Sequence, residues 1–152
     1  MEIKTLSEVP EHLETLAKWH HQQWGYMNPD NTLENRIAGM RNSLSADAVP
    51  QIHIALEDGH VLGSAAIVEH DMSTHKEWSP WLASVFVNPD FRQKGIGGKL
   101  VQSIMNYAKE QGFDKIYLFT PDKRAFYERL GWQFLATEPY CGSNQDILIF
   151  EP

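Results

Sequence analysis

Apolar residues recur along this chain with two spacings, one typical of strands and one typical of helices. The alternating Ile52, Ile54 and Leu56 lead into the Asp58-Gly59 dipeptide, which favours a tight hairpin turn. We therefore predict a β-hairpin whose second strand spans residues 61–70. Further strands are expected in "EIKTL", "WLASVFV" and "KIYLFT", and a final hairpin should join "WQFLATEPY" to "DILIF" around "CGSN".

Apolar positions three and four residues apart predict the helices. The clearest helix runs from about residue 97 to residue 111 and ends at Gly112, where a left-handed residue can stop it. Its apolar positions are Leu100, Val101, Ile104, Met105 and Ala108. Another helix is expected from Pro10 through Trp24, a second follows a cap at Thr32, and "DKRAFYERLG" predicts a short one.

The expected elements follow one another in the order β, α, α, ββ, β, α, β, α, ββ, a mixed α/β (α+β) succession. No repeat, low-complexity tract or linker interrupts it. We therefore expect a single domain over residues 1–152, long enough to bury a core of its own.

Composition narrows the classes of function. The longest apolar runs fall far short of the roughly 20 residues of a membrane span, and "MEIKTLSEVP" lacks the features of a secretory or transit segment. The single cysteine, Cys141, excludes an internal disulfide and agrees with a reducing compartment. We therefore expect a cytoplasmic protein without a membrane partner. The net charge of −7 argues against a nucleic-acid partner and is compatible with a cationic amine as substrate.

The stretch "NPDFRQKGIGGKL" lies between a predicted strand and the clearest helix, and it combines three glycines with three basic side chains. Unpaired N–H groups at a helix start, together with the helix dipole, would hold a di- or polyphosphate. Two nucleotide-binding loops are excluded by spacing. Leu100 stands where a Walker A loop needs Ser or Thr and where a dinucleotide fingerprint needs its third glycine.

Two motifs connect this loop to a known family. The run Arg92-Gln93-Lys94-Gly95-Ile96-Gly97 follows an Arg/Gln-x-x-Gly-x-Gly/Ala signature, and "AFYERLGWQF" carries a tyrosine on a short helix before a glycine and an aromatic residue. With these motifs and its order of elements, the chain resembles the GNAT superfamily of N-acetyltransferases over essentially its whole length. The resemblance implies one domain with a mixed, mostly antiparallel sheet of about seven strands and helices on both faces.

The resemblance also implies acetyl-CoA as co-substrate, and we expect no metal. In the family, loop amides hold the pyrophosphate of coenzyme A, and the pantetheine arm lies along the preceding strand. The resemblance also implies that the "WLASVFV" and "KIYLFT" strands part, so that the thioester lies in the gap between them. An Asn that the family often carries seven residues before its tyrosine is replaced here by Thr120. The expected cofactor-binding residues are Val85, Phe86, Val87, Arg92, Gln93, Lys94, Gly95, Ile96, Gly97, Gly98, Lys99, Thr120 and Phe126.

The reaction implied is direct attack of a primary amine on the thioester in a ternary complex. Tyr127 corresponds to the family tyrosine that serves as the acid, and backbone N–H groups near Val85 would stabilise the developing oxyanion. For the base we favour Glu69 in "VEHDM", with His70 next and an ordered water chain as a further alternative. The residues expected to bind the acceptor are Trp24, Tyr26, His70 and Asp71.

Two other interpretations stay open. A non-catalytic acyl-CoA sensor would keep the pocket without turnover, and an interaction protein would use the glycine loop only as a structural turn. The motifs leave the acceptor open between a small-molecule amine and a peptide amine, and they do not indicate whether acyl groups longer than acetyl are used. Dimers are common among similar proteins, so a homodimer is as open as a monomer.

Overall fold

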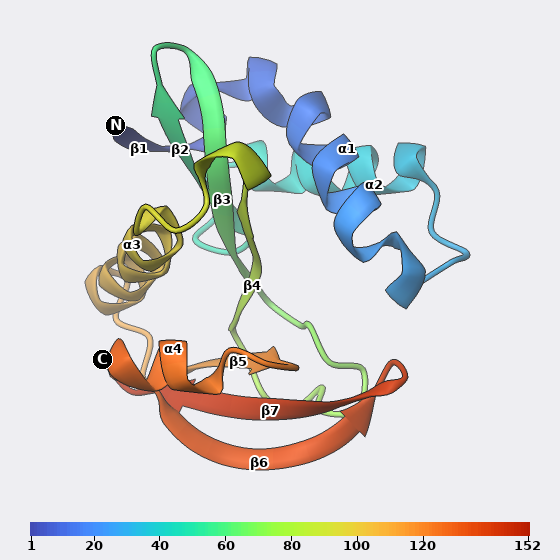
Figure 1. The fold of residues 1–152 in the computed structure, drawn as a ribbon, viewed down its shortest axis with the longest axis vertical. Helices are drawn as coiled ribbons and strands as arrows, with labels where there is room; N and C mark the ends of the chain where they lie inside the picture. The colour runs from blue at the N-terminus through green and yellow to red at the C-terminus, as the bar shows by residue number, and fades with distance from the viewer.

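Seven strands form one sheet in the order β1-β2-β3-β4-β5-β7-β6, and the computed structural model describes all residues from 1 to 152 (Figure 1). The strands are β1 (Glu2–Thr5), β2 (Gln51–Glu57), β3 (His60–Val68), β4 (Trp81–Val87), β5 (Ile116–Thr120), β6 (Gln133–Tyr140) and β7 (Ser143–Phe150). The helices are α1 (Leu13–Trp24), α2 (Leu33–Met40), α3 (Ile96–Glu110) and α4 (Arg124–Arg129), and the short 3₁₀ turns include η3 (Gly25–Met27) and η5 (Pro89–Phe91).

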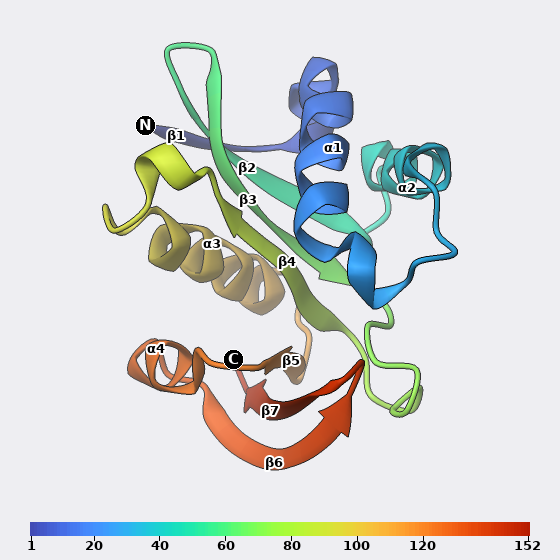
Figure 2. The ribbon, with the colours of Figure 1, turned by 45° about the vertical axis from the view of Figure 1, so that its right-hand side comes forward.

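The sheet consists of two antiparallel halves joined by one short parallel contact. Strands β1 to β4 form the first half, and β5, β7 and β6 form the second. The halves meet where β4 runs parallel to β5, and that pairing consists of the single register pair Trp81 and Tyr117. The Tyr117 N–H also donates to the Pro80 carbonyl oxygen at 3.0 Å. Beyond this point the two strands diverge, as Figure 1 and Figure 2 show.

Helices cover both faces of the sheet, which confirms the predicted mixed, mostly antiparallel architecture. Helices α1 and α2 bury one apolar cluster against β2 and β3, with Leu16 and Ile54 among its members. Helix α3 lies on the opposite face, where Leu100 and Ile104 join a cluster that extends to Tyr127 of α4 (Figure 2). Each such buried aliphatic side chain contributes roughly 1.5–3 kcal/mol to folding. None of the helices combines the length and the hydrophobicity that a membrane span requires.

A loop covers the remaining face of the second half of the sheet. Trp78, in the connection between β3 and β4, stacks on Tyr117 with ring centroids 5.1 Å apart, and His75 stacks on Trp78 at 4.0 Å. Met72 of the same connection is buried in a cluster with Trp81 and Tyr117. This loop therefore holds the end of β3 close to the point where β4 and β5 part.

Two element boundaries differ from those expected. The helix predicted from Pro10 begins as a 3₁₀ turn, because the Leu13 N–H donates to the Pro10 carbonyl three residues earlier. The α-helix proper starts at Leu13. The final hairpin turns at Cys141 and Gly142 alone, with φ of 50° and 85°, so β7 already begins at Ser143. A pair of left-handed residues matches the twist of the two strands and makes a longer "CGSN" loop unnecessary.

Candidate functional site

A β-bulge interrupts β4 near the place where it leaves β5. Between the Ala66–Ala83 and Ser64–Phe86 pairs, β4 has one residue more than β3. Ser84 in this bulge has a φ of 53°, in the left-handed region that residues with a side chain rarely occupy. The extra residue and the left-handed Ser84 change the direction of the N–H and C=O groups in the part of β4 that follows.

A glycine on β3 allows the two strands to approach closely beside this bulge. A Cβ atom built at Gly63 would lie 2.4 Å from the carbonyl oxygen of Phe86, a distance that no real side chain tolerates. The same atom would lie 3.2 Å from Leu100 Cδ1 of α3. Gly63 is therefore required for the path that β4 takes after the bulge.

The end of β4 has an open backbone edge on the side away from β3. The Asn88 N–H donates to the Leu62 carbonyl of β3 at 2.8 Å. Because successive residues of a strand direct their backbone groups to opposite sides, those of Val87 face away from β3. The Arg92 Nε atom donates to the Val87 carbonyl oxygen at 3.0 Å, while the pairing of β5 with β4 is confined to Trp81.

The glycine loop concentrates unpaired backbone N–H groups at the start of α3. Gln93 and Gly95 have φ of 64° and 79°, and Gly95, the N-cap residue, has no side chain to cap the helix. The Lys99 N–H makes the first helical bond, to the Gly95 carbonyl at 3.2 Å. The N–H groups of residues 96–98 therefore lack helical partners, and together with the helix dipole they favour an anion.

Three exposed cations lie in the same stretch of chain as these N–H groups, namely Arg92, Lys94 and Lys99. The Lys94 Nζ atom lies 5.5 Å from the centre of the Phe91 ring in η5, an arrangement that suits a cation–π contact. Their charges add a longer-range attraction for anions to the short-range donors of the loop.

Segments predicted to bind the cofactor converge near Gly97. A Cβ atom built there would lie 3.5 Å from Val87 Cγ2 and 4.0 Å from Phe126 Cζ. The glycine loop, the end of β4 and helix α4 therefore meet at this point. Thr120 ends β5 as a buried residue, and its hydroxyl oxygen accepts a hydrogen bond from the Lys123 N–H at 3.2 Å.

Tyr127 lies on α4 next to this convergence and is 7% exposed. Its ring meets those of Phe126 and Trp132 edge to face, with centroids 5.0 and 6.2 Å apart. Burial, and secondarily the charge of Asp122, raises the pKa of Tyr127 to about 12. The phenol is therefore protonated at neutral pH and able to donate a proton or a hydrogen bond.

The segment after β3 carries the predicted proton acceptors. Glu69 is exposed, and its Oε1 atom lies 3.7 Å from Nε2 of the half-exposed His70. Asp71 is partly buried, and this burial raises its pKa to about 7. Asp71, expected from the sequence only to bind the acceptor, therefore titrates near the pH at which a general base works best.

The two aromatic residues predicted to bind the acceptor have different surroundings. The Trp24 ring meets that of Phe86, on β4, edge to face at 6.1 Å. Tyr26 lies in η3 and is 72% exposed. The same turn contacts the last hairpin, because the Cys141 thiol donates to the Met27 carbonyl at 3.9 Å.

The β3–β4 connection is tied to the last hairpin as well. The Ser73 N–H donates to the Tyr140 hydroxyl oxygen at 3.1 Å. His75 lies between two carboxylates, with Nδ1 3.0 Å from Glu77 Oε1 and Nε2 2.7 Å from Glu138 Oε2. Hydrogen bonds to these two glutamates raise the pKa of His75. The β3–β4 connection and η3 thus both contact the last hairpin, and these two segments include Tyr26, His70 and Asp71, which are predicted to bind the acceptor.

Sequence reasoning missed a buried contact between α1 and β3. His20 Nε2 lies 2.9 Å from Ser64 Oγ, and the Ser64 hydroxyl donates to the Ser84 carbonyl at 3.4 Å. Burial, with a smaller effect from the charge of Arg36, lowers the pKa of His20 to about 3, so its ring is neutral. Helical spacing places His20 or His21 on the apolar side of the helix predicted from Pro10 through Trp24. No spacing rule connects that position to a serine 44 residues away.

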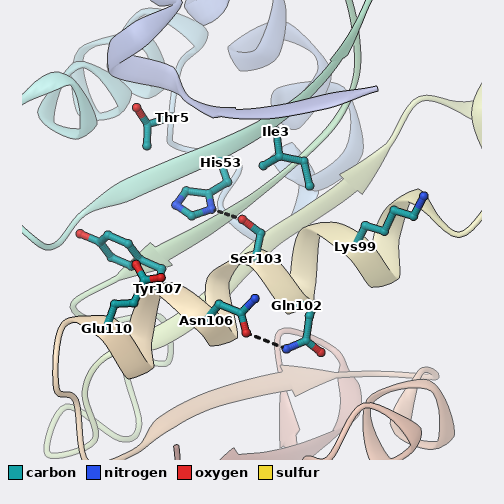
Figure 3. A pocket seen from close by; sticks show the side chains of 9 residues that line it. All are labelled: Ile3, Thr5, His53, Lys99, Gln102, Ser103, Asn106, Tyr107 and Glu110. Carbon is teal, nitrogen blue, oxygen red and sulfur yellow. Dashed lines mark hydrogen bonds between the residues drawn. The ribbon is translucent and has the colours of Figure 1, made fainter.

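A hollow of about 550 Å³ lies between β1, β2 and α3 (Figure 3). In it, His53 Nδ1 is 2.6 Å from Ser103 Oγ, and the buried Nε2 atom of the same ring has no partner. The hollow shares Lys99 with the glycine loop, and its other lining residues lie outside the predicted site. It is therefore separate from the convergence at Gly97.

A family model and a sequence relative both match most of this chain. The family model described as "Acetyltransferase (GNAT) family" matches residues 13–132. An aminoglycoside N(6')-acetyltransferase type 1 from Salmonella enteritidis is 29% identical over 115 residues, which make up 74% of this chain and 74% of that protein.

Solved structures resemble the whole chain. A ribosomal-protein-alanine N-acetyltransferase from Brucella melitensis aligns with a TM-score of 0.75 at 18% identity, over 100% of both chains. An aminoglycoside 6'-N-acetyltransferase complexed with coenzyme A aligns with a TM-score of 0.75 at 16% identity, over 99% of this chain and 97% of that one. At these identities the structures establish a shared fold.

Proposed function

Because this chain belongs to the acetyltransferase (GNAT) family, we propose that it transfers the acetyl group of acetyl-CoA to a primary amine of a small molecule. The amine attacks directly while both substrates are bound. Acetyl-CoA supplies the activated acyl group. The residues of the chain bind and orient the two substrates and transfer the protons.

One observation carries this proposal: the open edge of β4 lies beside the unpaired N–H groups at the start of α3. Those donors, with the exposed cations of residues 92–99, fit a pyrophosphate. The backbone of residues 85–87 fits an amide-bearing pantetheine arm, which can pair with a strand edge as an added strand. Phe126 of α4 and Thr120 at the end of β5 complete the proposed cofactor site.

Tyr127 is the proposed acid. A departing thiolate gains from a proton donor, and the pKa of about 12 keeps the Tyr127 phenol protonated throughout the physiological range. Its place on α4, next to Phe126, brings it close to the convergence of the cofactor-binding segments. The N–H of Val85, the residue after Ser84 within the bulge of β4, is the proposed donor to the acyl oxygen.

Two carboxylates are candidates for the base. An alkyl amine is mostly protonated at neutral pH, so a group near it must accept a proton before or during attack. Glu69 is our first candidate, and its exposed position suits proton transfer through a water. Asp71 is the second candidate, and we place it ahead of His70 because burial raises the pKa of Asp71 to about 7.

The proposed acceptor is a small cationic amine. The Salmonella relative is named for aminoglycosides, which carry several amino groups. The chain has a net charge of −7, and Trp24, Tyr26, His70 and Asp71 offer aromatic faces and a carboxylate to a cation.

Initial-rate kinetics with both substrates varied would test this function. The rate of acetyl-amine formation should depend on both concentrations and give intersecting double-reciprocal lines, as a ternary complex requires. Parallel lines would contradict direct attack, and the absence of amine-dependent turnover with aminoglycosides and simple amines would contradict the function.

A further inference from the structure

A buried series of hydrogen bonds runs from α1 through β3 to the bulge of β4. His20 Nε2 lies 2.9 Å from Ser64 Oγ, and the Ser64 hydroxyl donates to the Ser84 carbonyl at 3.4 Å. His20 is 2% exposed and Ser64 is fully buried. Since the hydroxyl has one proton and gives it to Ser84, it accepts its second bond from His20. A neutral His20 ring must therefore carry its proton on Nε2.

The bulge is the part of β4 that most needs such support. Ser84 has a φ of 53°, which glycine adopts freely and other residues rarely do. A bulge also disrupts the ladder of backbone hydrogen bonds, so a side chain is needed to hold the Ser84 carbonyl. The His20 ring is itself held by edge contacts with Trp24 at 5.2 Å and Phe86 at 6.1 Å.

The direction of the Ser84 carbonyl determines the direction of the next N–H group. The Ser84–Val85 peptide is not among the cis bonds of the chain. In a trans peptide the carbonyl and the following N–H lie in one plane and point in opposite directions. Because the Ser84 carbonyl points toward Ser64, the Val85 N–H points away from Ser64.

We propose that His20 and Ser64 are positioning residues that hold the Val85 N–H in the direction required to donate to the acyl oxygen. The inference rests on the proposed function, in which Val85 supplies that donor. Because His20 and Ser64 are both buried, we expect neither side chain to touch a substrate. A donor stabilises developing charge most when it needs no reorientation during the reaction, and these bonds fix it before substrates bind.

Substitutions at the two positions test the proposal kinetically. Ser64→Ala removes both hydrogen bonds and should lower kcat roughly ten- to a hundredfold, with both KM values within about twofold of wild type. His20→Leu should have the same effect. His20→Gln should recover most of the activity, because its side-chain amide can donate from nearly the same place as Nε2.

Ser43→Ala is a matched control. Ser43 is 2% exposed, and its hydroxyl donates to the Met40 carbonyl at 2.6 Å, so the variant loses a buried serine hydrogen bond in the first half of the fold. It leaves β4 untouched and should keep the wild-type kcat. Thermal unfolding of each variant establishes that the protein is folded under assay conditions.

Nuclear magnetic resonance of the free protein tests, in the absence of substrate, whether His20 and Ser64 orient the Val85 N–H. The His20 ring should give the ¹⁵N signature of a neutral, Nε2-protonated imidazole from about pH 5 to 8. The amide signal of Val85 should shift in Ser64→Ala and His20→Leu and stay in place in Ser43→Ala. An unmoved Val85 amide in Ser64→Ala would overturn the inference.

Failure of this inference differs from failure of the proposed function. Wild-type turnover combined with an unchanged kcat in Ser64→Ala, or with an equal loss in Ser43→Ala, would overturn only the positioning role. No turnover by the wild type would overturn the proposed function, and the Val85 amide shift would still decide whether Ser64 orients that group. Should Ser64→Ala fail to fold, the contrast between His20→Leu and His20→Gln decides the question.

Discussion

The Nε atom of Arg92 donates a hydrogen bond to the carbonyl oxygen of Val87 across 3.0 Å. One side chain thereby joins the open end of β4 to the loop that precedes α3. The bond uses one of the five N–H donors of the guanidinium, so the others remain for an anion in the loop. The strand edge proposed for pantetheine and the loop proposed for pyrophosphate are therefore held in a fixed relation by Arg92.

Arg92→Lys should weaken coenzyme A binding, because the substituted ammonium keeps the charge but cannot bond Val87 and a phosphate in the same planar way. We expect the Kd to rise about tenfold by titration calorimetry, the loss of one charge-assisted hydrogen bond. Lys94→Ala is the control, since Lys94 makes no bond to β4, and its effect should be smaller. Equal effects of the two substitutions would refute the linking role of Arg92.

Gly97→Glu should abolish coenzyme A binding, because a carboxylate would then occupy the convergence of loop, strand and α4 and repel phosphate. Gly97→Ala is the matched variant. Its Cβ atom would lie 3.5 Å from Val87 Cγ2, an ordinary contact, so the fold and most of the affinity should survive. Normal affinity in Gly97→Glu, measured by the same titration, would remove the loop from the cofactor site.

Tyr127→Phe should lower kcat by roughly a hundredfold, the usual contribution of a general acid, while the Kd for coenzyme A changes little. The reason is that substitution removes the phenolic proton and leaves the ring packed on Phe126 and Trp132. Stopped-flow or steady-state rates measured with the Kd separate the two effects. A parallel loss of affinity and turnover, or no loss of either, would argue against an acid role.

Asp71 predicts a pH dependence of stability whose sign is opposite to that of most carboxylates. Its pKa is raised from 3.8 to about 7 in the fold, so its contribution is full below the unfolded value and is lost as the pH rises through about 7. Relative to Asp71→Asn, the wild type should therefore lose stability between about pH 4 and 7 in urea unfolding. A flat difference between the two proteins across this range would disprove the raised pKa.

Asp71→Asn also tests whether Asp71 or Glu69 is the general base. If Asp71 accepts the proton, the rise of kcat/KM with pH through about 7 should disappear in Asp71→Asn and persist in Glu69→Gln. The reverse result would assign the base to Glu69.

Gly63→Ala should destabilise the protein by about 1–3 kcal/mol, because the new methyl group would meet the Phe86 carbonyl oxygen at 2.4 Å and displace β4. Gly39→Ala is the control. Gly39 lies within α2, with no atom in 4 Å of an added Cβ, and alanine there should be neutral or stabilising. Similar unfolding midpoints for the two variants would contradict the close approach of β3 and β4.

Local rules were sufficient to predict the order of elements. The apolar spacing of α3 and the Asp58-Gly59 turn of the first hairpin depend on nearest neighbours along the chain, so the sequence carries them directly. The glycine loop and Tyr127 were recognisable because motif residues lie within a few positions of each other.

The remaining features depend on tertiary contacts. The separation of β4 from β5 after Trp81 reflects packing of whole strands, and the left-handed Ser84 has no residue-type signal because serine rarely adopts that conformation. The raised pKa of Asp71 arises from its burial in the folded chain. The bond between His20 and Ser64 joins elements 44 residues apart.

The central claim is that this chain acetylates an amine, and release of free coenzyme A thiol from acetyl-CoA across a panel of small amines tests it most directly. Thiol release should require an amine and match the amount of acetylated product. Binding of acetyl-CoA at millimolar concentration or below, observed as a thermal shift and accompanied by no thiol release with any amine, would contradict the claim and identify a non-catalytic acyl-CoA-binding protein.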